Sequence, residues 1–537
     1  MAAHPEGPYQ TSGRPILSPR RRHRYRAWAW IVAIALVLAA IVFACIGLVI
    51  HRAEPILRGR VIETLSTRFK SRVELAEIHV WLADGLHVEG KGLKIYGATD
   101  PNPWEAGVQP LLDVPEFRFQ TALRNLFREP MRVDTILVDG LTLNIPPASQ
   151  RSEMRSLRRR GKTSIVVDQF VCTNTTLLIN TTRPAKPPLE FDISDLRLQQ
   201  VGPGQPLRFD AKLVNPKPIG IIHSTGLFGP VNESRPRDSA LAGTYSFTHA
   251  DLASFKGIAG ILSSSGRYGG TLGRIEVDGE TSTPDFQLTV SGHPVPLHTD
   301  FHAIVDGTDG DTYLDPVRAR IRESSLTARG KVVRVKTGHG HDIQMNVVLN
   351  RASIQDLLWL GVKTDPPVMT GTVKMTAALH LPAGADDLSE RLSLQGKFEV
   401  SDGYFSNDKL QTRIDALSLR SLGRPKLARQ ASEMTVPTEL RGAFGLTHGM
   451  LSFSSLHFQV PGTSAAVTGQ YSLDGSTFDF HGTLKMEAKL SQMTTGWKSI
   501  LLKPVDPFFS KHGNGTEVPF KISGTRSEPH FELDFHH

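Results

Sequence analysis

The stretch Leu451–Val460, LSFSSLHFQV, carries the pattern that decides the fold of this chain. It contains two short runs in which apolar and polar residues alternate, and the alternation returns at Phe478–Phe480, Leu484–Leu490 and Val518–Ile522. Because successive side chains of a β-strand point to opposite faces, each run predicts a strand with one apolar and one polar face. Similar runs, ended by Gly, Asp or Pro, begin at Val73 and fill nearly all of the chain after it. The body is therefore predicted to be mainly β, with short helices.

An apolar face on a long sheet has to be covered, and the pattern leaves two ways open. The sheet can pack on a second sheet as a sandwich with a dry core, or it can curl around something else that is apolar. Aromatic residues make up only 7% of the chain, so the face is mostly Leu, Val, Ile and Phe, which suits acyl chains as well as a protein core. The residues predicted to line this face near the C-terminus are Phe453, Phe458, Val460, Phe478, Phe480, Leu484 and Met486.

Apolar residues at helical spacing interrupt the strands at Ala250–Leu262, Ser353–Val362 and Ser491–Leu502, and each segment predicts a short helix. A further amphipathic helix is predicted at Pro55–Lys70, which either caps the start of the sheet or rests on a membrane surface or closes a groove. Five apolar residues in or after the last of the three segments either contact a membrane or a partner, or belong to a helix packed on the end of the sheet: Trp497, Ile500, Leu501, Phe508 and Phe509.

A short signature, in which a glycine and a threonine precede alternating apolar residues, recurs along the body. It is found at Gly243, Gly371 and Gly482, with a looser copy at Gly270. The recurrence indicates a degenerate internal repeat of strand modules. The glycine is expected to stand at a turn or at the entry of a strand, where its conformational freedom is useful.

The longest apolar run is Ala27–Ile50, which has 24 residues and no charge. As a helix it is about 36 Å long at roughly 1.5 Å per residue, enough to cross the hydrocarbon core of a bilayer. It is too long for the apolar region of a typical signal peptide, so we predict a single-pass anchor that is retained. Arginines crowd Arg20–Arg26 just before it, which places the N-terminal tail in the cytoplasm and the body on the other side of the membrane.

Charge and motifs point away from nucleic acids and from catalysis. The formal charge is +8, of which residues 1–26 contribute +5 (six Arg less one Glu), leaving about +3 for the rest. The two cysteines are Cys45 and Cys172, so the body cannot form an internal disulfide. The pattern His339–Asp342 and the acidic loop Asp306–Asp311 each favour a turn over a metal site. The common catalytic motifs are absent, and we predict no enzyme activity, no cofactor and no metal.

Several segments look familiar: Val460–Gly462 (VPG), Gly469–Leu473 (GQYSL), Phe478–Gly482 (FDFHG), Lys489–Ser491 (KLS), Leu501–Phe509 (LLKPVDPFF) and Pro519–Thr525 (PFKISGT). Through them, the region Leu451–Phe535 resembles the C-terminal domain of the AsmA family. Upstream, Phe255–Gly260 (FKGIAG) and Glu276–Phe286 (EVDGETSTPDF) are also similar to AsmA-type sequence, as is the layout of anchor, helix and first strands.

The resemblance implies a single-pass inner-membrane protein with a cytoplasmic N-terminus and a periplasmic body. It implies an antiparallel β-sheet curled into an elongated groove with an apolar interior, similar to chorein-type bridge proteins that carry lipids. The expected function is to bind phospholipid acyl chains in support of lipid transport between inner and outer membranes and of outer-membrane assembly. The expected partners are phospholipids, the inner membrane and outer-membrane or envelope assembly proteins, and no nucleic acid. The alternative is a non-enzymatic scaffold or regulator of outer-membrane protein assembly with a dry β core.

The predicted organisation has five parts. A disordered basic tail and the membrane helix occupy residues 1–26 and 27–50. The body then divides into an N-terminal β-groove region that begins with the amphipathic helix, residues 51–240, and a central β-rich region, residues 241–430. The AsmA-like C-terminal β region takes residues 431–537.

Overall fold

A computed structural model describes most of the chain after the predicted membrane span. The described residues are 58–59, 62–63, 65–66, 72–82, 85–96, 109–126, 131–145, 165–179, 189–202, 204–230, 232, 235–307, 310–335, 340–384, 386–428, 434–473, 477–493, 515–525 and 528–533. The predicted tail and the span Ala27–Ile50 lie outside them. So do five predicted contact residues, Trp497, Ile500, Leu501, Phe508 and Phe509.

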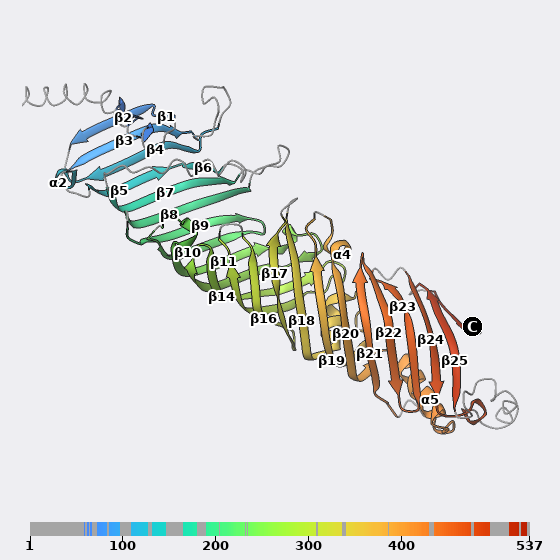
Figure 1. Ribbon diagram of the computed structural model, residues 1–537. Coiled ribbons are helices and arrows are strands. Elements are labelled where there is room, and N and C mark those ends of the chain that lie inside the picture. The colour runs from blue at the N-terminus through green and yellow to red at the C-terminus, as the bar shows by residue number, and fades with distance from the viewer. Residues whose placement is uncertain are drawn as a thin grey trace, which may run out of the picture.

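The described part of the chain is mainly β and forms one 26-stranded sheet. Strands that are close in the sequence pair with one another, so the sheet grows in one direction as the chain proceeds. Figure 1 shows an elongated body with the first strands at one end and the last at the other, and the strands turn along its length through the twist of the sheet. Pairing continues across both boundaries expected within the body, between β10 and β11 and between β20 and β21, and the division into regions stays a prediction.

The bounds of the strands follow, in three groups. The first ten are β1 (Val73–Glu74), β2 (Glu77–Leu82), β3 (Leu86–Ile95), β4 (Leu112–Thr121), β5 (Met131–Asp139), β6 (Thr142–Ile145), β7 (Ile165–Ile179), β8 (Leu189–Val201), β9 (Leu207–Pro216) and β10 (Ile219–Phe228). The next ten are β11 (Ala240–Asp251), β12 (Ile258–Ala259), β13 (Ile261–Thr271), β14 (Arg274–Leu288), β15 (Val295–Val305), β16 (Thr312–Ile321), β17 (Ser324–Arg334), β18 (His341–Ser353), β19 (Met369–Leu381) and β20 (Ser393–Phe405). The last six are β21 (Thr438–Thr447), β22 (Met450–Val460), β23 (Thr463–Ser472), β24 (Phe478–Met486), β25 (Thr516–Gly524) and β26 (Pro529–Leu533).

One junction departs from the predicted antiparallel arrangement, so the sheet is mixed. β7 runs parallel to β5 and β6, whereas the other pairs of described strands are antiparallel. Alternation reports the face on which a side chain stands and says nothing of the direction of the neighbouring strand. The sequence pattern therefore could not show that the strands at this junction run parallel.

Burial follows the alternation, but the apolar side of the sheet is not sealed. Along β9 and β13, exposed residues alternate with residues that are only partly buried. In β9 the exposed positions hold Arg208 and Asp210, and the partly buried ones hold Phe209 and Leu213. We call the second side the apolar face. The interior of a sandwich would bury it, whereas here it stays partly open.

Where the apolar face is closed, short helices close it. Helix α3 (Ile354–Gly361) packs on a cluster that contains Leu349, Val373 and Val400, each only 1–2% exposed. The helix is held by its buried Asp356, which accepts hydrogen bonds from Arg322 Nε at 3.0 Å and Ser324 Oγ at 2.7 Å. The prediction of a helix at Ser353–Val362 is thus confirmed.

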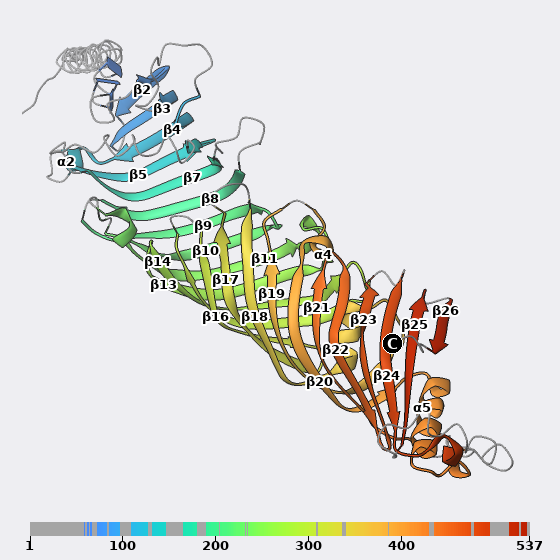
Figure 2. The same ribbon diagram turned by 45° about the vertical axis from the view of Figure 1, so that its right-hand side comes forward.

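Helix α5 (Asp408–Ser421) packs at one end of the C-terminal strands, as Figure 2 shows. Its cap is Asn407, whose side chain accepts a hydrogen bond from the Leu410 amide at 3.0 Å. The face that it buries is largely polar: Asp415 accepts from the Val436 amide, and Ser418 donates to the Pro461 carbonyl. Apolar periodicity therefore did not predict α5. Two shorter helices are α2 (Leu123–Leu126) and α4 (Leu388–Arg391).

The helix predicted at Ala250–Leu262 is wrong. The structure has the end of β11, a 3-10 turn over Leu252–Ser254, the short strand β12 and the start of β13. Gly257 and Gly260 adopt φ values of +99° and +128°, which interrupt a helix at this place.

Two other predicted helices are described only in part. Six described residues of Pro55–Lys70 are helical: Arg58, Gly59, Ile62, Glu63, Leu65 and Ser66. A 3-10 helix over Leu490–Met493 reaches the start of Ser491–Leu502, and the rest of that segment lies outside the described residues.

The glycine signature meets the prediction at two of its four positions: Gly371, near the start of β19, and Gly270, beside the turn from β13 to β14, have φ values of +140° and +122°. The other two have a different role. Gly243 and Gly482 lie within strands and not at strand entries, each opposite an aromatic residue of the next strand. A Cβ on Gly243 would stand 2.6 Å from Tyr268 Oη, and one on Gly482 would stand 2.8 Å from Phe520 Cζ. These glycines make room for rings that lie flat across the neighbouring strand. Local sequence shows such a glycine but not its partner.

Candidate functional site on the apolar face

Strand register brings the seven predicted lining residues onto one face. Phe453 in β22 is opposite Gly469 in β23, which is opposite Phe480 in β24. Two positions further along this face, past Leu456, Val467 and Gly482, the same three strands align Phe458 with Ala465 and Leu484. The remaining three follow the same register: Phe478 pairs with Tyr471, and Val460 and Met486 both pair with Thr463.

Phenylalanine rings form a continuous row on this face, and we call it the phenylalanine row. Its ring contacts join Phe398 to Phe444 at 6.1 Å, Phe398 to Phe453 at 6.2 Å, Phe453 to Phe480 at 6.2 Å and Phe478 to Phe480 at 6.4 Å between centroids. The row crosses from β20 to β24, and each contact lies in the range of favourable aromatic pairs. It presents an apolar band that runs along the sheet, perpendicular to the strands.

Exposure divides the predicted lining residues into two groups. Val460 and Met486 are only 3% and 7% exposed and lie at the strand ends beside α5, where side chains close the face. The other five are partly buried, so a ligand on this face could reach them: Phe453, Phe458, Phe478, Phe480 and Leu484.

Two residues that were not predicted to line the face, Phe398 and Phe444, extend the row toward the centre of the chain. Both stand in alternating segments, with Leu394 and Val400 flanking the first on the same face and Leu440 and Leu446 flanking the second. That alternation was a usable signal. What it lacked was the register that sets these segments beside β22.

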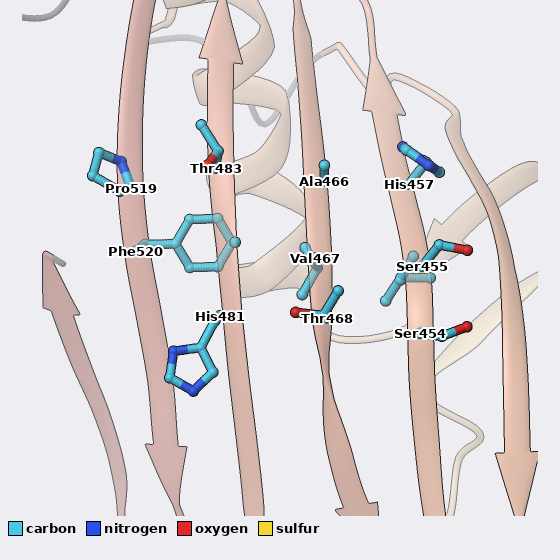
Figure 3. A pocket seen from close by; sticks show the side chains of 12 residues that line it. Ser454, Ser455, His457, Ala466, Val467, Thr468, His481, Thr483, Pro519 and Phe520 are labelled. Atoms are coloured by element: carbon cyan, nitrogen blue, oxygen red, sulfur yellow. The ribbon is translucent and has the colours of Figure 1, made fainter. Parts of the chain in front are cut away.

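A hollow of about 330 Å³ lies over β22–β25 and is lined by residues of both faces: His457, His481 and Thr483 stand on the polar face, and Val467 and Phe520 stand on the apolar face by register. Figure 3 shows side chains from all four strands around it, with the ring of Phe520 lying across toward β24. Two histidines line it, and His481 pairs with Asp479 at 3.2 Å. Among the described residues, no hydrogen bond joins His457 or His481 to a serine or threonine of the hollow. The arrangement offers no nucleophile with an activating base.

The weak metal patterns of the sequence have other partners in the structure. Asp342 accepts hydrogen bonds from His380 Nε2 at 2.7 Å and Gln344 Nε2 at 2.8 Å, while His339 lies outside the described residues. In the acidic loop, Asp306 pairs with Arg237, and Asp311 accepts from the Arg334 amide. No group of three or more His, Cys, Asp or Glu placed to hold a metal occurs in the described part of the chain.

Exposed ionisable groups on the polar face form pairs, both within a strand, as Arg274 with Glu276, and across strands, as Asp278 with His302. Asp278 accepts from His302 Nδ1 at 2.8 Å, and this hydrogen bond lowers the pKa of its carboxyl. On the apolar face, the pKa of the one thiol among the described residues is shifted in the opposite direction. Cys172 is 0% exposed, and burial raises its pKa to about 11. The polar face is thus a solvated surface, while Cys172 belongs to an inert core.

Comparison with known proteins does not assign this chain to a family. No protein-family model, no curated protein and no solved structure matches this chain. Among the described residues, no helix has both the length and the apolar character needed to span a bilayer.

Proposed function

We propose that this chain is an AsmA-like protein, anchored in the inner membrane, that holds phospholipid acyl chains against its apolar face. The face would act as a groove that shields the chains while the headgroups stay in water. In this way the periplasmic body would support lipid transport between the inner and outer membranes and outer-membrane assembly. No covalent chemistry is required of it.

The observation that supports the proposal most directly is the partly exposed phenylalanine row. Monomeric proteins rarely expose long contiguous apolar bands, and those that do use them for binding. Transfer of an acyl chain from water to such a surface is favourable by about 0.8 kcal/mol per CH₂. Phe453 lies in the middle of the row and contacts Phe480 at the β24 end, so a chain seated along the row would contact both rings.

Photo-crosslinking of the full chain in its own membrane tests the proposal. A benzoylphenylalanine placed at Phe480 stands on the apolar face, and one placed at the exposed Thr468 of the neighbouring strand stands on the polar face. We expect phospholipid adducts from position 480 and none from position 468. A matched pair of charged variants, Phe480→Asp and Thr468→Asp, should show loss of lipid only for the first, with both proteins folded.

The scaffold alternative predicts other results. Protein adducts at position 480 in place of lipid would show that an envelope partner covers the apolar face. If Phe480→Asp unfolds the protein, the face is a dry core, because an unpaired buried charge is very costly. Either outcome would reject lipid binding at this site.

A further inference from the structure

Hydroxyl side chains gather on the apolar face midway along the sheet, between β10 and β15. By register, Tyr245 in β11 stands on the same face as Leu241 and Phe247, and Tyr268 in β13 on the same face as Leu262. We call the whole set the hydroxyl belt, and its members are Ser224, Tyr245, Ser264, Tyr268, Thr281 and Thr299. The phenylalanine row itself contains no hydroxyl and has Tyr471 beside it, opposite Phe478, so the two parts of the face differ in how many hydroxyl groups they carry.

The belt hydroxyls bond to one another in three pairs. Ser224 Oγ and Tyr268 Oη are 2.7 Å apart, and Tyr245 Oη and Ser264 Oγ are 3.1 Å apart. The third pair, Thr281 and Thr299, has its two Oγ1 atoms 2.6 Å apart across β14 and β15. The pairs explain how polar groups are tolerated on an apolar face.

A count of protons shows what the tyrosines still offer. Ser224 Oγ donates to the Thr244 carbonyl at 3.0 Å, and Ser264 Oγ donates to the Glu280 carbonyl at 2.8 Å. A serine has one hydroxyl proton, so its contact with a tyrosine is also a hydrogen bond only when the tyrosine donates. Each tyrosine then donates its proton to the paired serine of the belt. Each tyrosine oxygen keeps a lone pair that can accept a hydrogen bond from a ligand.

Glycines hold the two tyrosine rings flat, which keeps these oxygens on the face. A Cβ on Gly243 would stand 2.6 Å from Tyr268 Oη, and one on Gly279 would stand 2.6 Å from Tyr245 Oη. Both tyrosines are only partly buried. The belt is therefore a surface of fixed acceptors set among apolar side chains.

We propose that the hydroxyl belt selects acyl chains that carry a hydroxyl group, and this inference rests on the proposed function. A plain acyl chain that covers the belt removes water from the tyrosine oxygens and gives them no donor, which costs binding free energy. A chain hydroxyl at the same depth donates to one of them. A hydrogen bond of ordinary strength makes about a 5- to 10-fold difference in affinity.

A crosslinking competition in the full chain tests this selectivity. Benzoylphenylalanine is placed at Phe301, whose ring lies over Gly279 beside Tyr245, or at Phe480 in the phenylalanine row. Membrane vesicles that contain the protein receive equal amounts of myristic acid and β-hydroxymyristic acid. The ratio of the two adducts is measured by mass spectrometry. The ratio at position 480 corrects for partition into the vesicle and for photochemistry.

We expect the hydroxylated adduct to be favoured at position 301 by about 5- to 10-fold over the ratio at position 480. Tyr245→Phe with Tyr268→Phe should abolish this preference, because it removes only the oxygens and leaves the rings over their glycines. Tyr471→Phe, on the same face but outside the belt, should leave the preference intact.

The remaining outcomes overturn one proposal or both. Equal ratios at the two positions, or a preference that survives the double variant, would reject the selectivity while leaving lipid binding in place. Absence of any fatty-acid adduct at both positions would reject the proposed function and the selectivity with it. Adducts retained at position 480 in the double variant show that the protein is folded.

Discussion

Phe453 and Phe480 contact each other at 6.2 Å between ring centroids, although their strands β22 and β24 do not pair. Gly469 in β23 lies between them and is the register partner of both. The absence of a side chain at Gly469 lets the rings meet above the intervening strand. The phenylalanine row thus depends on a residue that contributes no atoms to it.

Substitution Gly469→Ala should lower the stability of the C-terminal part of the sheet. The new Cβ would stand 2.2 Å from the Asp479 carbonyl oxygen and 2.5 Å from a ring carbon of Phe480, so both backbone and ring must shift. Overpacking of this kind costs about 1–3 kcal/mol. Urea unfolding of the full chain, followed by protection of β22–β24 against hydrogen exchange, measures the loss.

Gly269→Ala is the matched control, because Gly269 also lies in a strand and has nothing within 4 Å of its Cβ position. It should be neutral or slightly stabilising, since alanine reduces the freedom of the unfolded chain. Equal destabilisation by both variants would show that the ring contact across β23 is not the cause.

Replacing a side chain by alanine should lower the free energy of unfolding more under α3 than in the phenylalanine row. Leu349 is 2% exposed, and Leu349→Ala should lower the free energy of unfolding by about 2–5 kcal/mol. Phe453 is partly exposed, so Phe453→Ala should cost only about 1–2 kcal/mol despite the larger side chain. Denaturant titration of both variants gives the comparison. A loss at Phe453 as large as that at Leu349 would mean that the row is sealed.

The hydrogen bonds of Asp356 should decide how firmly α3 closes the apolar face. Asp356→Ala removes the acceptor for Arg322 and Ser324 and should destabilise the helix by about 1–3 kcal/mol. Amide exchange within Ile354–Gly361 should then be about tenfold faster or more. The exposed Lys363, changed to alanine, serves as the control. Unchanged protection of the α3 amides against exchange in Asp356→Ala would show that the hydrogen bonds of Asp356 do not hold the helix in place.

The thiol of Cys172 should be unreactive in the folded protein. Burial raises its pKa to about 11 from an ordinary value of 9.0, so its thiolate fraction near neutral pH is lower by about 100-fold. Iodoacetamide labelling in a Cys45→Ser background should be slow until urea unfolds the sheet. Rapid labelling of the native protein would show that this part of the apolar face opens.

The same shift makes a prediction about pH. Above its ordinary pKa the thiol ionises in the unfolded chain while the folded chain keeps the proton, so the unfolded state binds fewer protons. The contribution of Cys172 to stability is therefore complete at neutral pH and is lost as pH rises toward about 11. Cys172→Ala should flatten this part of the stability profile.

Much of the secondary structure could be predicted because strand alternation is a local property. Ser353–Val362 was also predictable, since apolar residues at helical spacing mark the face that packs on the sheet. Helix α5 was not, because it buries polar side chains, among them Asp415 and Ser418, whose partners come from distant loops. The helix at Ala250–Leu262 was predicted wrongly, because the prediction followed the helical spacing of the apolar residues and gave too little weight to the two glycines that interrupt a helix there.

The sequence by itself determined which side chains share a face, because the period of a strand is two whatever surrounds it. Strand β22 is an exception: Phe453 and Phe458 are five residues apart, which strict alternation would place on opposite faces, and a shift of register between Phe453 and Leu456 brings them onto the same one. Only the tertiary structure decided that this face stays partly open, that Val460 and Met486 are closed off beside α5, and that tyrosine hydroxyls meet serines across β10–β13. Those outcomes depend on pairing between segments far apart in the chain, and alternation is the same for a sealed core and an open face.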